Sequence, residues 1–395
     1  LSPTTRRAIF LLSLATFSSM ALQRICDPML PELSRVFDAP ISEVSQVISL
    51  FALTYGLMQL FYGPVGDRFG KYRVVMLATL GCSVACVLSS LSADLDFLVA
   101  ARVATALATA AIIPLSLAWV GDTVHYEQRQ ETLARVGLGT MLGITAGQLF
   151  GGLFTDTLGW RWAFVLMAIA FATVCFLLSR QLKHLEPMPH HAHAPVGFFK
   201  QLKQVAHNAW ARTLLGIALI EGAMIFGLLA VTASLLHQTH HVSLTLAGGT
   251  TGLFGLGGMA YMAAAKLAIR RFGEVGLARY GGLYFGIAFL VIAFSPWWQM
   301  ALPACFVAGF AFAMFHNTMQ AKATQMVPTA RATGVTLFAG FLFLGQSLGV
   351  LLLAGLISHF HSSYVLGGVG IGVVLLGIFF AHAITQRNAT QADHA

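Results

Sequence analysis

The sequence contains little charge for its length. Only 10% of its 395 residues are Asp, Glu, Lys or Arg, whereas a soluble domain carries about 25%. Hydrophobic residues make up 57% of the chain, and the mean hydropathy is +0.76. This composition excludes an ordinary soluble domain and predicts that lipid surrounds most of the chain.

Two motifs of energy-coupled and catalytic proteins are also absent. There is no GxxxxGK[ST] loop and no soluble stretch long enough for a nucleotide-binding fold, which argues against direct drive by ATP within this chain. HExxH is missing as well, which argues against a membrane metalloprotease. We therefore predict a protein that is not an enzyme, needs no cofactor and draws its energy from a gradient.

Cysteine is scarce and carries no recognisable site. The five cysteines lie inside apolar runs and form no CxxC pair, so they are interpreted as small packing residues. Histidines cluster between His184 and His193 in a stretch that we expect to be a solvated loop. We predict no metal site in either place.

Long apolar runs, separated by short polar turns, dominate what is present. A bilayer core of about 30 Å requires about 20 apolar residues per helix, and twelve runs qualify. A run such as Val74 to Leu91 does not alternate as a barrel strand would, so we predict an all-α integral membrane protein with twelve transmembrane helices. The expected spans are 8–31, 43–64, 72–92, 96–120, 134–156, 161–181, 211–236, 245–268, 276–295, 299–325, 332–357 and 364–386.

The net charge of +8 is explained by where the basic residues lie. If the N-terminus is inside, the outer loops contain only Arg35 and Arg161 as basic residues. This bias is the positive-inside rule. It predicts a multi-pass protein of the bacterial cytoplasmic (inner) membrane with both termini in the cytoplasm. Because this bias accounts for the basic residues, we predict no nucleic-acid partner. The first run lacks a small-residue cleavage site and is expected to stay in the membrane.

Two pairs of motifs recur at an offset of about 200 residues. Arg68-Phe69-Gly70 recurs as Arg271-Phe272-Gly273, and Gly147-Gln148 recurs as Gly345-Gln346. Parallel repeats of this kind occur in transporters. We predict two parallel-repeat six-helix bundles around a central cavity: residues 1–182, a cytoplasmic linker at 183–209 rich in proline and histidine, and residues 210–395.

The strongest local motif is the turn Gly63-Pro64-Val65-Gly66-Asp67-Arg68-Phe69-Gly70-Lys71-Tyr72-Arg73. It resembles the signature loop of the major facilitator superfamily, GxxxDRxGRR in outline. Physically, Gly63 is expected to allow close approach of a neighbouring helix, and Gly70 a sharp turn. The alternative reading is a solvated charged turn.

The resemblance implies a conformational latch on the cytoplasmic side. Asp67 would face the start of the eleventh helix near Thr333, where a carboxylate is favourable, and Arg68 would pair with Asp122. In the second half Arg270 stands where the acid would be, so the latch is expected to be asymmetric. The predicted latch residues are Gly63, Asp67, Arg68, Gly70, Lys71, Arg73 and Asp122.

The fifth run contains glycines at four-residue intervals, which line one helix face and allow close packing. This ladder is similar to one in the drug/proton antiporters of the superfamily, but Gln148 stands where they carry proline. Two readings stay open, a hinge surface and ordinary tight packing. The hinge or packing residues are Gly139, Gly143, Gly147, Gln148 and Gly151.

Charged residues inside the first half form a second candidate site. Asp27-Pro28-Met29-Leu30-Pro31 is similar to the acid-x-x-x-Pro segment of twelve-helix drug exporters, and Arg102 stands where the family places a cavity arginine. Counting 1.5 Å per residue, Arg24, Asp27 and Arg102 lie at similar depths. We expect one charged cluster, although Asp27 near the outer end of its helix can equally be a hydrated carboxylate.

In the second half, Glu221 is the most deeply placed acid, about 15 Å into its helix by the same count. An ionisable residue inside a membrane is a functional hypothesis by default. The alternative is an acid held by a neighbouring helix for structure. His316 and Asn317 of the tenth run are further candidates for the cavity, against a packing role.

These features together predict a secondary transporter that works by alternating access. The main hypothesis is proton-coupled efflux of small amphipathic molecules, with Asp27 or Glu221 carrying the proton. The alternative is a carrier of a specific anionic or zwitterionic metabolite, which the extra cation Arg24 favours. The alternative hypothesis that does not involve transport is a receptor built on a transporter fold. The expected partners are a small-molecule substrate, protons and the lipid bilayer, with the protein a monomer.

Overall fold

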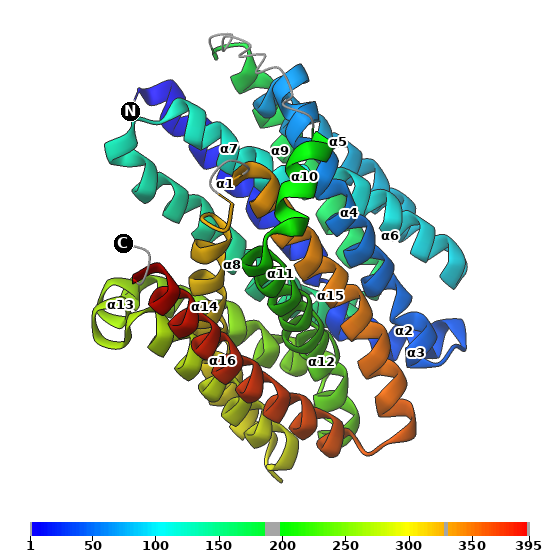
Figure 1. Cartoon of the computed structure of the whole chain (residues 1–395). Helices are drawn as coiled ribbons and strands as arrows, with labels where there is room; N and C mark the ends of the chain where they lie inside the picture. Colours follow the sequence, from blue (N-terminus) through cyan, green and yellow to red (C-terminus); the bar gives the residue numbers. More distant parts are fainter. Residues whose placement is uncertain (1, 186–197, 328–330, 393–395) are drawn as a thin grey trace. The chain divides into compact units, whose positions relative to one another are not determined.

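The computed structural model describes residues 2–185, 198–327 and 331–392, and all regular structure in these ranges is helical. The chain runs from α1 in blue to α16 in red (Figure 1). It divides into two compact units. The first contains Leu1–Val196 and Ser243–Gly249, and the second contains Gly197–Val242 and Thr250–Ala395.

In the part of the first unit that the structure describes, ten helical elements are complete. Two of its membrane segments are interrupted. The first breaks at a 3₁₀ turn because Pro28 has no N–H to donate, and the fourth breaks between α6 and α7. The elements are α1 (Pro3–Arg24), η1 (Asp27–Met29), α2 (Leu30–Phe37), α3 (Ile41–Val44), α4 (Gln46–Phe69), α5 (Lys71–Ser90), α6 (Leu95–Thr109), α7 (Ile112–Thr123), α8 (Tyr126–Thr157) and α9 (Trp160–Leu182).

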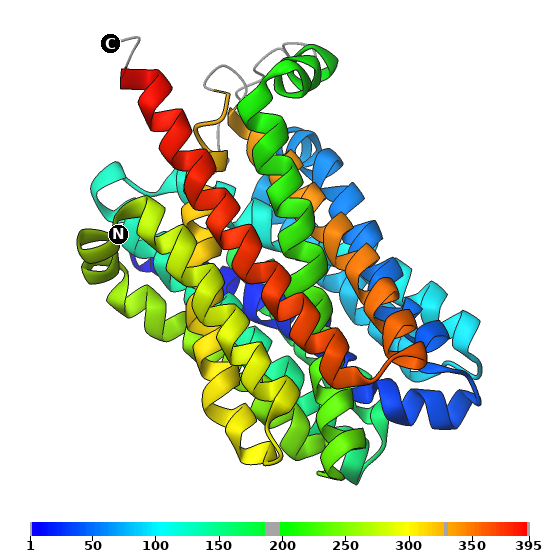
Figure 2. The ribbon, with the colours of Figure 1, turned by 60° about the horizontal axis from the view of Figure 1, so that its bottom comes forward.

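The second unit is seen from another direction in Figure 2, where α16 is the long red helix. It includes a short helix, α10, inside the stretch that was predicted to be only a linker. Its elements are α10 (Phe198–His207), α11 (Ala209–Glu221), the π-helix η2 (Gly222–Phe226), α12 (Gly227–His240), α13 (Leu244–Phe294), η3 (Trp298–Met300), α14 (Ala301–Ala323), α15 (Arg331–His359) and α16 (Ser362–Ala392).

The membrane segments agree with the expected number. Eleven helices in the described ranges are long and apolar enough to cross a bilayer. One of them, α13, has 51 residues and would be about 75 Å long if straight, more than twice a bilayer core. It is two helices joined at Gly273, whose φ is 58° and ψ 179°. The prediction of twelve transmembrane helices is confirmed.

Close packing at glycines joins a corresponding pair of helices in each unit, α8 with α1 in the first and α15 with α11 in the second. In the first unit, a Cβ added at Gly147 would lie 2.4 Å from the Ala21 carbonyl oxygen of α1. In the second unit, a Cβ at Gly345 of α15 would lie 1.9 Å from the Leu219 carbonyl oxygen of α11. Gly139 and Gly143 also pack on α1, and Gly151 packs on Ile25, the residue that follows α1. The glycine ladder of the fifth run is therefore a tight-packing surface inside the first unit.

The start of α13 is grouped with the first unit and is capped there. The Asp156 carboxylate accepts hydrogen bonds from the Leu244 and Thr245 amides, at 3.3 and 2.6 Å, and one from the Thr245 hydroxyl at 2.7 Å. A carboxylate is favourable at a helix N-terminus because the first amides have no partner within the helix.

We predict that Gly345→Ala lowers the thermal stability of the purified protein, because the added methyl group has no room against the Leu219 carbonyl. Overpacking of this kind costs about 1–3 kcal/mol. The matched control is Gly216→Ala in α11, where an added Cβ meets no atom within 4 Å. Thermal unfolding in one detergent measures both, and equal melting temperatures for the two variants would contradict the packing role of Gly345.

Candidate functional site

Asp27 is the fully buried carboxylate of the first unit. It begins the 3₁₀ turn that follows α1, so the break before Pro28 determines its position. Its Oδ2 accepts a hydrogen bond from Gln148 Nε2 at 2.7 Å and lies 3.7 Å from Arg24 Nη1. Its Oδ1 has no hydrogen-bond partner among the described residues. Contacts with Gln148 and Arg24 therefore fix Oδ2, whereas Oδ1 remains available to form a hydrogen bond.

Arg102 is equally buried, but backbone groups position it. Its Nε donates to the Val47 carbonyl at 3.3 Å and its Nη1 to the Leu22 carbonyl at 3.1 Å. The guanidinium also lies 4.2 Å from the centre of the Phe51 ring, within the range of a cation–π interaction. Among the described residues, the Arg102 and Asp27 side chains form no ion pair with each other, and Arg102 attracts the carboxylate as a nearby charge. The structure thus places Arg24 beside Asp27 with the Arg102 charge nearby, and a shared role of the three residues in transport stays a prediction.

Gln148 has a different role from the one expected. The sequence placed it among hinge or packing residues, yet its side chain donates to Asp27. Its neighbours Gly147 and Gly151 bring α8 against α1, which carries this amide to the carboxylate. The departure from proline at this position is the signal in the sequence that pointed to Gln148.

Glu221 is the fully buried carboxylate of the second unit. Its Oε1 lies 3.0 Å from Nδ1 of His316, whose side chain is 16% exposed. The His316 ring stacks on Phe312, with ring centres 4.9 Å apart. Glu221 Oε2 has no hydrogen-bond partner among the described residues. The structure pairs two residues that the sequence offered as separate candidates, and the half-buried Asn317 follows His316 in the chain.

A π-helix begins directly after Glu221, at Gly222. Single-turn π segments of this kind occur frequently at functional sites. A Cβ added at Gly222 would lie 1.9 Å from the Leu342 carbonyl oxygen and 2.9 Å from the Gln346 amide nitrogen. The wider turn and the close approach of α15 fix the backbone beside Glu221. No pattern in the sequence indicated this feature.

The two units therefore share one arrangement. In the first unit, Gln148 follows the packing glycine Gly147 and donates to Asp27. In the second unit, Gln346 follows the packing glycine Gly345, and its backbone nitrogen lies 2.9 Å from the Cβ position of Gly222, the residue after Glu221. Gln346 is buried, and its Oε1 has no hydrogen-bond partner among the described residues.

The segment around Gln346, Gly345-Gln346-Ser347-Leu348-Gly349, matches the GxSxG pattern of hydrolases, but it lies within the continuous helix α15. A nucleophile elbow needs a sharp strand-to-helix turn, so this is no such site.

The loop after α4 differs from the predicted latch in two contacts. Asp122 forms its ion pair with Lys71 at 2.6 Å, and Lys71 also pairs with Asp67 at 2.8 Å. The expected pairing of Arg68 with Asp122 is wrong because Lys71, the first residue of α5, takes that place. Arg68 instead lies over the Phe69 ring.

The glycines of this loop divide in their roles. Gly70 has φ 88°, as the sharp turn requires. A Cβ at Gly63 would meet nothing within 4 Å, whereas one at Gly66 would lie 2.5 Å from Leu115 Cδ2. The close approach expected at Gly63 is found at Gly66. Arg73 is exposed, and the contact expected between Asp67 and the start of the eleventh helix stays a prediction.

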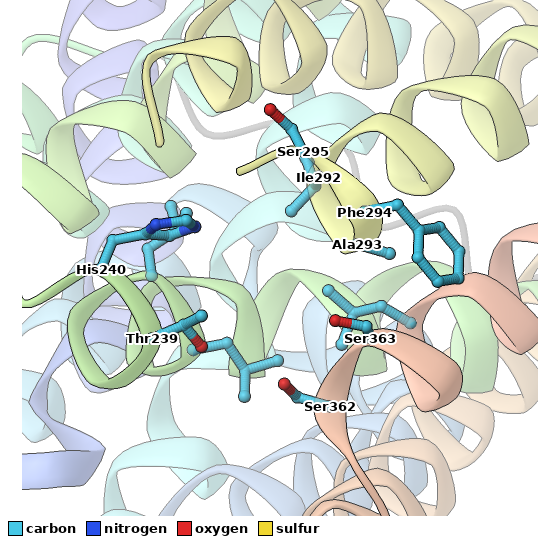
Figure 3. Close-up of a pocket in the computed structure, with 11 residues that line it drawn as sticks. Thr239, His240, Ile292, Ala293, Phe294, Ser295, Ser362 and Ser363 are labelled. Atoms are coloured by element: carbon cyan, nitrogen blue, oxygen red, sulfur yellow. The ribbon is translucent and has the colours of Figure 1, made fainter. Parts of the chain in front are cut away.

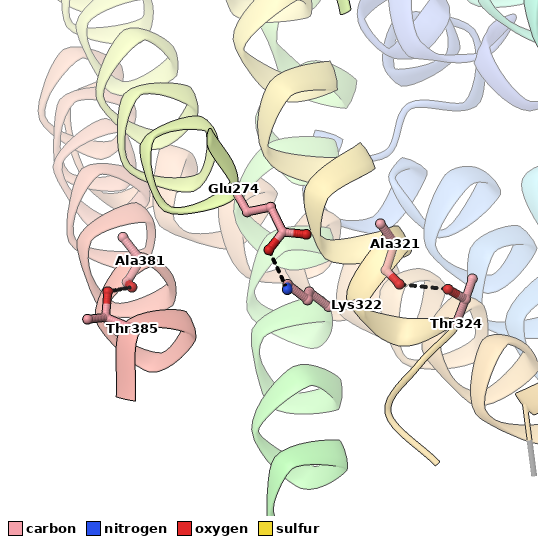
Figure 4. A network of polar contacts seen from close by, with 6 residues as sticks. All are labelled: Glu274, Ala321, Lys322, Thr324, Ala381 and Thr385. Atoms are coloured by element: carbon pink, nitrogen blue, oxygen red, sulfur yellow. Dashed lines mark hydrogen bonds and ion pairs between the residues drawn. The ribbon is translucent and has the colours of Figure 1, made fainter. Parts of the chain in front are cut away.

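The second unit contains a counterpart of the Lys71–Asp122 pair with the charges exchanged. Glu274 follows Gly273 as Lys71 follows Gly70, and it accepts a hydrogen bond from Lys322 at 2.5 Å (Figure 4). Lys322 lies in the last turn of α14, as Asp122 lies near the end of α7. The predicted asymmetry of the latch stays a prediction, while an ion pair at this place is present in both units.

A separate pocket of the second unit lies where α12 and α13 end and α16 begins (Figure 3). It has a volume of about 190 Å³, and neither Glu221 nor His316 lines it. Its polar lining consists of Thr239, His240, Ser295, Ser362 and Ser363. Across the described ranges, no group of three His, Cys, Asp or Glu side chains is arranged to hold a metal ion.

Comparison with known proteins places these features in a family. Residues 12–349 match the family model described as Major Facilitator Superfamily. Over 386 residues, 94% of this chain and 93% of the relative, the sequence is 26% identical to "Multidrug efflux protein YfmO" of Bacillus subtilis (strain 168).

Other relatives match over part of their length. The chain is 29% identical over 172 residues to "Probable multidrug resistance protein EmrY" of Escherichia coli (strain K12), which is 43% of this chain and 34% of that protein. It is 29% identical over 162 residues to "Citrate exporter 1" of Aspergillus niger, 41% of this chain and 31% of that protein. The chain thus spans about a third of the length of these two relatives.

Solved structures share the fold. The nucleoside transporter NupG superposes with a TM-score of 0.75 over 97% of this chain and 99% of the other, at 13% sequence identity.

We predict that the Glu274–Lys322 pair contributes measurably to stability. Glu274→Lys and Lys322→Glu each place like charges together, and the double variant restores the attraction. Partly exposed pairs are worth about 0.2–1 kcal/mol, so each single variant is expected to lose that amount, with most of it recovered in the double. Thermal unfolding measures the cycle. The matched control is the exposed pair Glu131–Arg135, whose reversal is expected to show little coupling.

We also predict coupling between Gln148 and Asp27. Gln148→Met removes the amide that holds a buried carboxylate, and a hydrogen bond to a charged group is worth about 1.5–3 kcal/mol. In an Asp27→Asn background, the same change is expected to cost less because the neutral amide needs less support. A double-mutant cycle of thermal unfolding tests this, and strictly additive effects would contradict it.

Proposed function

Because this chain belongs to the major facilitator superfamily, we propose that it is a proton-coupled exporter of small amphipathic molecules. The chain is a multi-pass secondary transporter of small molecules and not an enzyme. The proton coupling, the direction of transport and the class of substrate are the proposal.

The observation that carries the proposal is one fully buried carboxylate in each unit, Asp27 and Glu221. A charged group at membrane depth is costly and marks ion pathways and proton relays. In both carboxylates, one oxygen is held by a neighbour and the other has no partner among the described residues. Each carboxylate is thus a position at which a proton can be added and removed.

In the first unit, protonation changes the forces on two neighbours. An ionised Asp27 attracts Arg24 and accepts the Gln148 amide proton. A proton arriving from outside neutralises the carboxylate, which weakens both contacts. Because Gln148 lies on α8 and Arg24 on α1, proton binding alters the force between the two helices. Substrate competes with the proton for the same cluster.

In the second unit, Glu221 and His316 share the equivalent role. A proton on either group changes the charge of the pair, since His316 contacts Glu221 through Nδ1. The ring of His316 is held against Phe312, so its orientation is fixed while its charge changes. The pair is therefore a second proton site, which carries the proton either together with Asp27 or instead of it.

The relative that covers nearly the whole chain is named a multidrug efflux protein, and this supports export of drug-like molecules. We further propose that the protein is a monomer in the bacterial inner membrane with both termini in the cytoplasm, as the distribution of basic residues indicates.

A carrier for a specific anionic or zwitterionic metabolite is the second candidate. Among the described residues of the first unit, two buried guanidinium groups, Arg24 and Arg102, accompany one buried carboxylate, and this excess of positive charge suits an anionic substrate group. One partial relative is named a citrate exporter. His316 and Asn317 would then contribute to substrate binding.

We predict that a pH gradient across proteoliposomes drives substrate flux by the purified protein. Asp27→Asn and Glu221→Gln remove the titratable group while keeping its size, so they are expected to abolish gradient-driven flux and retain exchange of substrate across the membrane. Flux of labelled substrate measures both quantities. The control is Glu43→Gln, which changes an exposed carboxylate on α3.

Two outcomes would contradict parts of this proposal. Full gradient-driven flux in both variants would exclude Asp27 and Glu221 as proton carriers. No flux with either a pH or a sodium gradient, over a panel of amphipathic cations and carboxylates, would exclude coupling. A thermal-shift screen of the same panel separates the two substrate classes, because a ligand that binds the folded state stabilises it.

A further inference from the structure

A cationic pocket lies in the first unit where the end of α9 meets the start of α1. It has a volume of about 280 Å³ and is lined by Arg7, Arg180, Gln181 and His184. None of these residues belongs to the cluster around Asp27, to the Glu221–His316 pair or to the loop after α4.

A buried amide forms the base of this pocket. Gln181 is 3% exposed, and its Nε2 donates to the Thr4 carbonyl of α1 at 3.1 Å. This bond joins the two helix ends and so fixes the spacing between Arg7 and Arg180. In the part of the chain that the structure describes, neither arginine forms an ion pair with an acidic side chain. The pocket therefore holds positive charge without a described acid to balance it.

The helix surface next to the pocket is apolar. Phe10 lies three residues after Arg7 on α1, and Phe176 lies four residues before Arg180 on α9, so each aromatic ring is on the same helix face as its arginine, one turn closer to the membrane centre. The two rings are 62% and 58% exposed. The Arg180 guanidinium lies 5.3 Å from the centre of the Phe176 ring. Basic groups at the helix ends are thus followed at once by a surface suited to acyl chains.

We propose that this pocket binds the phosphate of an anionic phospholipid, with the acyl chains along Phe10 and Phe176. Basic pockets between transmembrane helices at the cytoplasmic side suit such head groups, and arginine matches phosphate geometry with paired donors. Free inorganic phosphate shares the head-group chemistry but makes no use of the two exposed rings. The site lies on the membrane side that holds the N-terminus, and its existence does not depend on which substrate is transported.

The test measures lipid binding to the full chain in detergent by native mass spectrometry. The probes are palmitoyl-oleoyl phosphatidylglycerol, phosphatidylcholine with the same acyl chains, and inorganic phosphate. We expect a preference for phosphatidylglycerol. The double variant Arg7→Gln/Arg180→Gln is expected to lower its affinity by more than about tenfold, since each basic residue near a membrane surface contributes about fivefold.

The matched control is Arg271→Gln/Arg387→Gln, which removes the same charge from the second unit. Each of these arginines also lies over an aromatic ring, Phe272 and Trp210. The control is expected to leave the affinity unchanged. An equal loss in both double variants would overturn the proposal in favour of general electrostatic attraction.

Two further results would overturn the proposal. Equal affinity for the two lipids would exclude selection of the head-group charge. Inorganic phosphate that displaces phosphatidylglycerol at similar concentrations would indicate a site for the free anion. Unchanged melting temperatures of the variants in lipid-free detergent show that a lower affinity is not caused by unfolding.

Discussion

Backbone contact between helices at glycine is the constraint on which both buried sites depend. Lipid tails are as apolar as the helices, so association relies on close packing and hydrogen bonds rather than on the hydrophobic effect. Gly147 and Gly151 place α8 directly on α1, and Gly345 places α15 on α11. In the first unit this contact carries the Gln148 amide to Asp27. In the second it brings α15 against the π-helix that follows Glu221. The polar chemistry therefore follows from the packing of helices.

The two units have corresponding polar sites, but the charged residues at these sites differ. In the first, the Arg24 guanidinium lies beside the carboxylate, and in the second, the His316 imidazole does. The loops at the helix ends show the same relation. Lys71 with Asp122 and Glu274 with Lys322 occupy corresponding places with opposite polarity. An ion pair of either polarity gives the same attraction, so a repeated fold can keep the contact while the residues exchange sign.

Several details of the sites were not predictable from the sequence. The resemblance of the turn to a family signature suggested that Arg68 pairs with Asp122, but side-chain reach from a turn depends on where the next helix begins, and Lys71 begins it. Gln148 was recognised as a departure from proline, yet its partner is 121 residues away in the chain. The π-helix at Gly222 left no signal in the sequence, because the residues around it are apolar on nearly every side of the helix and show no period that an inserted residue could shift. Arg7 and Arg180 were counted only as cytoplasmic charge, and their shared pocket depends on the packing of α1 on α9.

The sequence by itself determined the solvent, the number of membrane helices, the internal repeat and the family. These properties depend on local composition and on short motifs, which are read along one stretch of chain: apolar runs of bilayer length, Gly70 and Gly273 at equivalent turns, and a signature loop. Only the tertiary structure decided which polar groups meet. Asp27 with Gln148, Glu221 with His316 and Glu274 with Lys322 join residues 48 to 121 positions apart. Such contacts are set by the rotation and depth of whole helices, which close packing at a few glycines fixes and which no local pattern records.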